Sequence, residues 1–347
     1  MKTINKSAIK KNTRLYTFVK WTLFLLIIIL IIPRLNHSKF PGTSTDEFGY
    51  LYHAARFVGW NWDNLVEYYP FYGAGISILW LPSFLLFSNN PEFLYQSIVF
   101  INAILLAISF WISLKCADNL FPDWNEWIKL FSCFCIVFYP SNYFYAREAL
   151  PETLLYLLFW TMILALIKFI DSYKIKWLLV VSVTSGYMIL VHLRTAGLLI
   201  ALTIFLIYFF LFNKISLSKF VPYLLIITSS GIALILIQQN YYQNLGGANA
   251  ANVQNTQISI TNMLETIITN LISSGIGCSG HIFYYLLAGG LVFFFAMLFL
   301  AKKSIHYLRS SIKNKKSCIT NESIFLFLIF AFIINFVAFY VTPHEYI

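Results

Sequence analysis

The sequence predicts an all-α polytopic membrane protein, and three observations support this prediction. Hydrophobic residues make up 59% of the chain and charged residues only 11%, whereas soluble domains carry about 25% charged residues. Apolar runs of about 20 residues, the length that a helix needs to cross a bilayer, recur along the chain. The runs are continuous and do not alternate with polar residues, which argues against a transmembrane β-barrel.

Nine apolar segments are predicted to cross the membrane. They are residues 18–35, 93–114, 127–145, 152–170, 177–192, 197–212, 221–239, 281–301 and 323–341. The first follows a basic N-terminus without a small-residue cleavage site, so we interpret it as an uncleaved span. A further apolar segment, residues 71–88, is either a short span or a juxtamembrane helix.

The distribution of Lys and Arg decides between these two alternatives. If residues 71–88 do not cross and the N-terminus is cytoplasmic, 19 of the 24 Lys and Arg residues are inside. The remaining five, which are Arg34, Lys39, Arg56, Arg147 and Arg194, are outside. A crossing at 71–88 would instead invert all later segments and place 16 outside. The positive-inside rule therefore favours nine spans, with juxtamembrane helices in an outer loop at about 34–92.

The chain is accordingly predicted to form a single transmembrane domain over residues 1–347, in the plasma (inner) membrane, with no soluble C-terminal domain. A second outer loop is expected at about 240–280, either as a lid or as a passive connector. The net charge of +10 comes from Lys and Arg in short loops, so it is no sign of a nucleic-acid partner. Cys133 and Cys135 lie in an apolar run without a nearby His or acid, and no metal site is predicted there.

An acidic pair follows the first span. Ser44 and Glu47 fit a capping box, so a helix is expected to begin there. On that helix Asp46, Tyr50 and His53 form one polar stripe. The opposite stripe, Phe48, Leu51, Ala55 and Val58, is apolar and suited to lying against a membrane. The plainer interpretation is that Glu47 only caps the helix and that Asp46 faces water.

A second acidic group precedes the fourth span, on the same predicted outer face. Pro151 suits the first position of a helix, and Glu152 then lies in its first turn, where the helix dipole favours an acid. Arg147 and Glu148 come just before. A structural role is open for each: Glu152 at the helix start, and Arg147 and Glu148 as a pair.

The order of these motifs resembles the GT-C membrane glycosyltransferases, in particular the branch of protein O-mannosyltransferases and the lipid A aminoarabinose transferase. The resemblance lies in Asp46-Glu47 after span one, in the stretch from Tyr69 to Gly73, and in an acid at the outer end of span four. The segment from His192 to Thr195 is similar to a basic motif after span five. The resemblance covers about residues 15–215.

The resemblance implies an inverting transfer of a sugar from a polyprenyl-phosphate donor to a protein, lipid or glycan acceptor at the outer face. Asp46 is the expected base, with Glu47 beside it. The implied substrate-binding residues are Tyr50, His53, Tyr69, Arg147, Glu148, Glu152 and Arg194. The two arginines suit contacts with the lipid phosphate. No cofactor is certain, but a divalent cation between Asp46 and Glu148 or Glu152 is compatible with the family.

The chain departs from the family in length, because family members usually continue for several more spans, so a truncation at the C-terminus is open. Two other function classes also stay open. A polysaccharide polymerase or ligase of the outer face ranks second, although the 240–280 loop lacks the Arg and His that it needs. A lipid flippase or transporter ranks third, because transporters carry ionisable groups at mid-membrane and the predicted spans are nearly free of charge.

Overall fold

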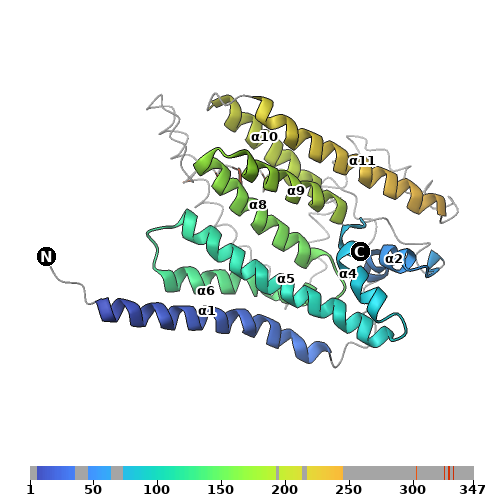
Figure 1. Ribbon diagram of the computed structural model, residues 1–347, viewed down its shortest axis with the longest axis horizontal. Helices are drawn as coiled ribbons and strands as arrows, with labels where there is room; N and C mark the ends of the chain where they lie inside the picture. Colours follow the sequence, from blue (N-terminus) through green and yellow to red (C-terminus); the bar gives the residue numbers. More distant parts are fainter. Residues whose placement is uncertain are drawn as a thin grey trace, which may run out of the picture. The chain divides into compact units, whose positions relative to one another are not determined.

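The computed structural model of the chain describes residues 6–35, 46–63, 73–192, 195–212 and 217–244, together with 302, 324, 327, 328 and 331. All the elements in these residues are helical, as predicted (Figure 1). The predicted span at 281–301, the span at 323–341 apart from residues 324, 327, 328 and 331, and the 240–280 loop beyond residue 244 lie outside the described residues, as do the site residues Tyr69 and Arg194.

The chain divides into two compact units. The first contains Met1–Phe169, Tyr173–Leu193 and Pro222–Gly247, and the second contains Ile170–Ser172, Arg194–Val221 and Ala248–Ile347. In the second unit, helix α10 (Ala196–Phe212) is followed by a short 3-10 helix, η2 (Leu217–Phe220). The Phe205 ring packs against that of Phe327, and the Phe210 ring against that of Phe220.

The first unit holds the remaining helices. They are α1 (Lys6–Leu35), α2 (Asp46–Phe57), α4 (Gly75–Leu86), α5 (Pro91–Leu120), α6 (Glu126–Val137), α7 (Pro140–Ala146), α8 (Glu152–Ser172), α9 (Ile175–Val191) and α11 (Val221–Asn244). Four segments of the described chain are long and apolar enough to cross a bilayer. These are Arg14–Ile32, Pro91–Leu120, Glu152–Ser172 and Ser218–Asn240.

Helices α1, α5 and α6 pack side by side, and α1 and α5 run between the same two ends of the unit (Figure 1). At one end the Tyr16 ring lies 5.6 Å from that of Trp127. At the other end the Tyr143 hydroxyl donates to the Leu30 carbonyl at 3.2 Å. Because α5 begins at this second end, where α1 also ends, the chain between them does not change sides.

Helix α4, which lies between α1 and α5 in the sequence, is too short to cross the membrane. Its 12 residues span only about 18 Å at 1.5 Å per residue, whereas the hydrocarbon core of a bilayer is about 30 Å thick. The helix is packed against α2, α5 and α9. The short length of the helix favours the juxtamembrane alternative for residues 71–88 over a crossing.

The predicted span at 127–145 is wrong as a single helix. The structure has α6 and α7 separated by Phe138 and Tyr139. Pro140 is the cause, because proline disfavours the helical conformation in the residue before it, and Tyr139 has the extended dihedrals φ −58° and ψ 142°.

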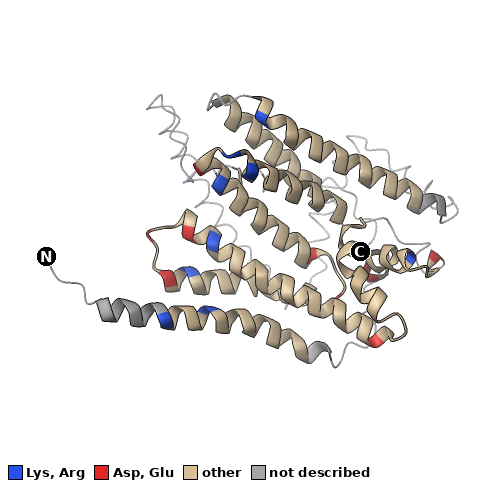
Figure 2. Ribbon diagram, in the orientation of Figure 1, with Lys and Arg blue, Asp and Glu red and all other residues tan. Residues whose placement is uncertain are grey.

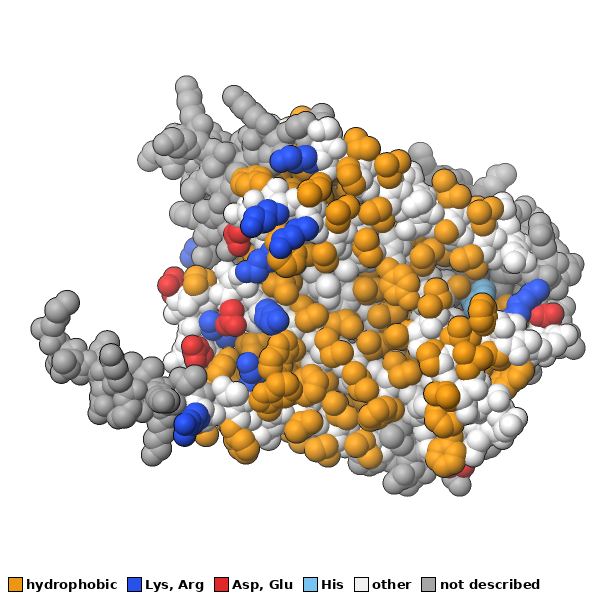
Figure 3. Space-filling view, viewed as in Figure 1, with side chains coloured by type: hydrophobic (Ala, Val, Ile, Leu, Met, Phe, Trp, Pro, Cys, Tyr) orange, Lys and Arg blue, Asp and Glu red, His pale blue; other side chains and the backbone are white. Residues whose placement is uncertain are grey.

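Charge is unequally divided between the two ends of the first unit (Figure 2). The basic end is the one where α5 and α8 finish and α6 and α9 begin, and it carries Lys115, Lys129, Lys168, Lys174 and Lys176. Lys129 is buried in α6 and pairs with Asp118 at 2.8 Å. The opposite end, which we call the acidic end, carries α2 and the turn at residues 147–151. Hydrophobic side chains cover much of the visible face between them (Figure 3).

Candidate functional site

Glu47 is the residue around which the acidic end is assembled. Its side chain is fully buried, and its Oε1 atom accepts a hydrogen bond from the Tyr95 hydroxyl at 2.5 Å and one from the Ala149 backbone N–H at 2.6 Å. Hydrogen bonds to a carboxylate are shorter and stronger than neutral ones. Glu47 therefore ties α2 to the start of α5 and to the turn that precedes α8.

The turn at 147–151 brings the second acidic group to the same place. Glu148 is 8% exposed, and Arg147 ends α7 with its guanidinium 4.9 Å from the centre of the Tyr143 ring. Within the described residues the buried Nε atom of Arg147 has no hydrogen-bond partner. Glu152 lies in the first turn of α8, as predicted, although Pro151 is the N-cap of that helix and not its first residue. The hydrogen bond to Ala149 thus brings Glu47 to the turn that carries Arg147 and Glu148, and Glu152 follows this turn at the start of α8.

Helix α2 is embedded in the protein, which corrects the expectation that one of its stripes lies against the membrane. Leu51 and Ala55 are buried in the main hydrophobic core, and Phe48 packs on a smaller cluster with Leu234 of α11. Amphipathicity alone does not distinguish an interfacial helix from one that packs on other helices. Asp46, the first residue of α2, remains partly exposed.

Close packing fixes α2, α4 and the end of α9 together. The Ser77 hydroxyl donates to the Tyr50 carbonyl at 2.6 Å, and the Tyr187 hydroxyl donates to the Gly75 carbonyl at 2.8 Å. Gly73 has φ +138°, and a Cβ atom there would lie 2.5 Å from the Val191 carbonyl oxygen. Only glycine adopts this conformation at so short a distance from another backbone.

The predicted polar stripe of α2 meets the end of α9. The Tyr50 ring is buried, and its centre lies 6.1 Å from that of the buried His192 ring. Tyr50 follows Asp46 by one helical turn and so lies on the same side of α2. The beginning of the predicted basic motif is therefore placed beside the stripe that carries Asp46.

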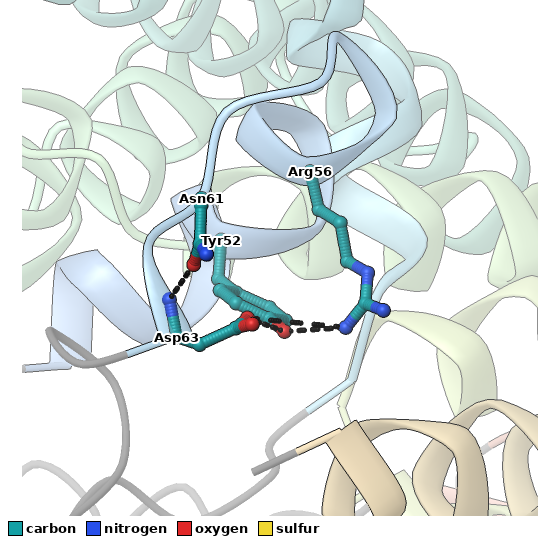
Figure 4. Close-up of polar contacts among 4 residues, drawn as sticks. All are labelled: Tyr52, Arg56, Asn61 and Asp63. Atoms are coloured by element: carbon teal, nitrogen blue, oxygen red, sulfur yellow. Dashed lines mark hydrogen bonds and ion pairs between the residues drawn. The ribbon is translucent and has the colours of Figure 1, made fainter.

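His53 lies on α2 beside Tyr52, which belongs to a polar group with Arg56 of the same helix and with Asn61 and Asp63 after it. Tyr52 donates to Asp63 at 2.7 Å and accepts from Arg56 at 2.7 Å, and the Asp63 N–H donates to Asn61 (Figure 4). Burial, followed by the hydrogen bond to Asp63, raises the pKa of Tyr52. Burial and the Arg56 charge lower the pKa of His53 to about 4. His53 is therefore neutral near pH 7 and able to accept a hydrogen bond.

The tryptophans after α2 have a packing role. The Trp60 and Trp62 rings lie 5.7 Å apart, and both pack on the buried Phe84 of α4 at 5.5 and 6.2 Å. Aromatic contacts at these distances stabilise a fold beyond the area that they bury. The cluster holds residues 60–62 on α4.

Sequence reasoning missed Tyr95, Asn102 and the Tyr52–Arg56–Asp63 group. A signal for Asn102 was present, because an amide in an apolar segment of this length is costly unless it has a partner. Tyr95 gave no such signal, since tyrosine near the end of a span is common. Within the described ranges no group of three His, Cys, Asp or Glu residues is placed to hold a metal ion. The divalent ion between Asp46 and Glu148 or Glu152 stays a prediction.

Comparison with known families is consistent with this arrangement. Residues 78–241 match the family model described as dolichyl-phosphate-mannose-protein mannosyltransferase. The match supports an integral membrane glycosyltransferase, and it includes Tyr95, the 147–151 turn and Glu152. Asp46 and Glu47 precede it and are connected to it by the contacts of Glu47. No curated protein and no solved structure matches the chain.

Proposed function

We propose that the protein transfers a sugar from a polyprenyl-phosphate donor to an acceptor, and that the reaction takes place at the acidic end of the first unit. The observation that carries the proposal is the 2.6 Å hydrogen bond between Glu47 and the Ala149 N–H. It joins the helix that begins with Asp46 to the turn that carries Arg147 and Glu148. The match to a mannosyltransferase family over residues 78–241 supports the choice of donor.

Each group in this arrangement has a chemical role in the proposal. Displacement of a phosphate from an anomeric carbon requires a base for the acceptor proton and a cation for the leaving phosphate. Asp46 is the base, because it is partly exposed and stands at the start of α2. Arg147 holds the phosphate, because its Nε has no hydrogen-bond partner among the described residues. Glu47 is already engaged by two donors, so in this proposal it positions Asp46 and does not itself accept the proton.

The remaining predicted residues take supporting roles. Glu148, which follows Arg147 in the turn, and Glu152, in the first turn of α8, orient the acceptor. Tyr50 and His53 extend the polar stripe along α2. Tyr69 and Arg194 lie outside the described residues, and their substrate-binding roles rest on the family resemblance alone. The acidic end faces the outside, because the opposite end carries the Lys residues that the positive-inside rule assigns to the cytoplasm. The membrane is the plasma (inner) membrane, and the acceptor is a protein, lipid or glycan.

The donor class provides the test. We would incubate membranes from cells that produce the full chain with radiolabelled polyprenyl-phosphate mannose, and count label in acceptors after the lipid is extracted. Membranes without the protein are the control, and a nucleotide-linked mannose is the competing donor. We expect incorporation from the lipid donor. Transfer from the nucleotide sugar by purified protein free of lipid donor would reject the proposal.

A further inference from the structure

Asn102 stands out in α5 as a buried amide in a long apolar helix. The side chain is fully buried, and its Nδ2 atom donates to the Glu148 carbonyl at 2.7 Å and lies 3.5 Å from the Leu150 carbonyl. Other polar side chains of α5 behave differently: Ser109 and Ser113 donate to carbonyls of their own helix, at 2.8 and 2.9 Å. Asn102 therefore bonds across to the turn before α8.

Asn102 and Glu47 bind backbone groups of three consecutive residues in the turn. Asn102 donates to the carbonyls of Glu148 and Leu150, and Glu47 accepts from the N–H of Ala149 between them. Backbone groups in a turn are not paired by regular secondary structure, and when they are buried they need partners from side chains. The two side chains, one from α5 and one from α2, supply these partners.

We propose that Asn102 is a positioning residue for sugar transfer. It sets the conformation of the turn at 147–150 and hence the position of the Arg147 guanidinium. The inference rests on the proposed function for its link to the donor phosphate. Asn102 lies in the interior of α5, well beyond its first residue, Pro91. In this proposal it acts on the reaction only through the conformation of the turn. An amide at this depth is costly in a membrane helix unless its partners repay the cost. The two carbonyls of the turn are the partners of its Nδ2 atom, while its buried Oδ1 atom has no hydrogen-bond partner among the described residues.

The test uses hydrogen–deuterium exchange of the purified full chain, read in peptides that cover residues 147–150. In Asn102→Leu the two carbonyls lose their donor, so the turn opens more often and the Ala149 amide exchanges faster. We expect about a tenfold increase, which corresponds to about 1.4 kcal/mol and lies within the range for the loss of a buried hydrogen bond. Peptides from α9, which makes none of these contacts, should be unchanged. Equal exchange in the turn, or a uniform increase along the chain, would overturn the inference.

Two further variants keep the test decisive. Ser109→Ala removes a buried polar group from the same helix. Because Ser109 donates to the carbonyl of Leu105 in α5 and not to the turn, this variant should exchange at 147–150 as the wild type does. Asn102→Ser replaces Asn102→Leu if the latter does not fold. A serine hydroxyl satisfies itself within the helix, as Ser109 does, and is too short to reach the turn, so we expect the same local increase.

A kinetic measurement connects the turn to the reaction and separates positioning from a general loss of folded protein. If the turn places Arg147, Asn102→Leu should raise the KM for the lipid-linked donor by about tenfold, the loss expected for one charge-assisted contact. Loss of folded enzyme would lower the maximal rate and leave KM unchanged, which would contradict the positioning role. If the wild-type protein transfers no sugar, the proposed function fails, while the exchange experiment still decides whether Asn102 holds the turn.

Discussion

Replacement of Asp46 by asparagine is expected to lower sugar transfer by at least about 100-fold, because loss of a general base typically costs 10²–10⁴-fold in rate. The amide keeps the size and shape of the side chain but cannot accept the acceptor's proton. Asp46 is partly exposed at the first position of α2, and an acid at a helix start contributes only about 0.3–1 kcal/mol to stability. The measurement is transfer from the lipid-linked donor, with melting temperature beside it.

The matched control for this variant is Asp123→Asn. Asp123 is an exposed acid in the loop between α5 and α6, at the basic end of the first unit, so the same chemical change there should leave transfer near wild type. Near-normal transfer by Asp46→Asn would remove Asp46 as the base and direct attention to Glu148 or Glu152. A fall in transfer that parallels a fall in melting temperature would instead indicate that Asp46 only stabilises the helix.

Replacement of Glu47 by alanine should differ from Asp46→Asn in causing a large loss of stability. The variant leaves the Tyr95 hydroxyl and the Ala149 N–H without the acceptor that Glu47 provides, and an unsatisfied buried donor costs about 1–3 kcal/mol. It also removes buried volume. We expect a fall of several degrees in melting temperature, together with loss of transfer, because α2 is no longer tied to the turn.

Glu47→Gln separates the acceptor role of Glu47 from its charge. The glutamine keeps one oxygen that accepts hydrogen bonds, so it should lose less stability than Glu47→Ala and less transfer than Asp46→Asn. Tyr95→Phe removes only one of the two hydrogen bonds and should fall between wild type and Glu47→Ala in melting temperature. A Glu47→Gln variant that melts as wild type but loses transfer as fully as Asp46→Asn would show that Glu47 takes part in the chemistry.

Much of the fold follows from local properties of the sequence. The helices α1, α5, α8, α9 and α10 occur where apolar runs predict them, because run length and hydropathy are sufficient to define a membrane helix. The break between α6 and α7 was missed, since Pro140 interrupts an otherwise apolar run and its effect on Tyr139 is a backbone property. The environment of α2 was also mistaken, because an amphipathic pattern says that one stripe is buried but not what buries it.

Part of the candidate site was also predictable from local properties of the sequence. Acids at the ends of apolar runs are visible in the sequence, and the distribution of Lys and Arg predicts that they share one face. Which atoms meet is a property of tertiary packing. The bond from Glu47 to Ala149 joins residues 102 positions apart, and the bond from Asn102 to Glu148 joins residues 46 positions apart. No local pattern specifies such contacts, and they are the ones that bring the two acidic groups together.

Photo-crosslinking of the lipid donor tests the central claim most directly, namely that the acidic end binds the phosphate of a polyprenyl-phosphate sugar. The probe is a polyprenyl-phosphate mannose analogue with a diazirine next to the phosphate, added to the purified full chain and mapped by mass spectrometry. The account predicts crosslinks in peptides from residues 46–57 and 140–152, which unlabelled donor suppresses and which weaken in a variant without the Arg147 guanidinium. Crosslinks confined to the basic end, in peptides from residues 115–129 and 168–177, would contradict it.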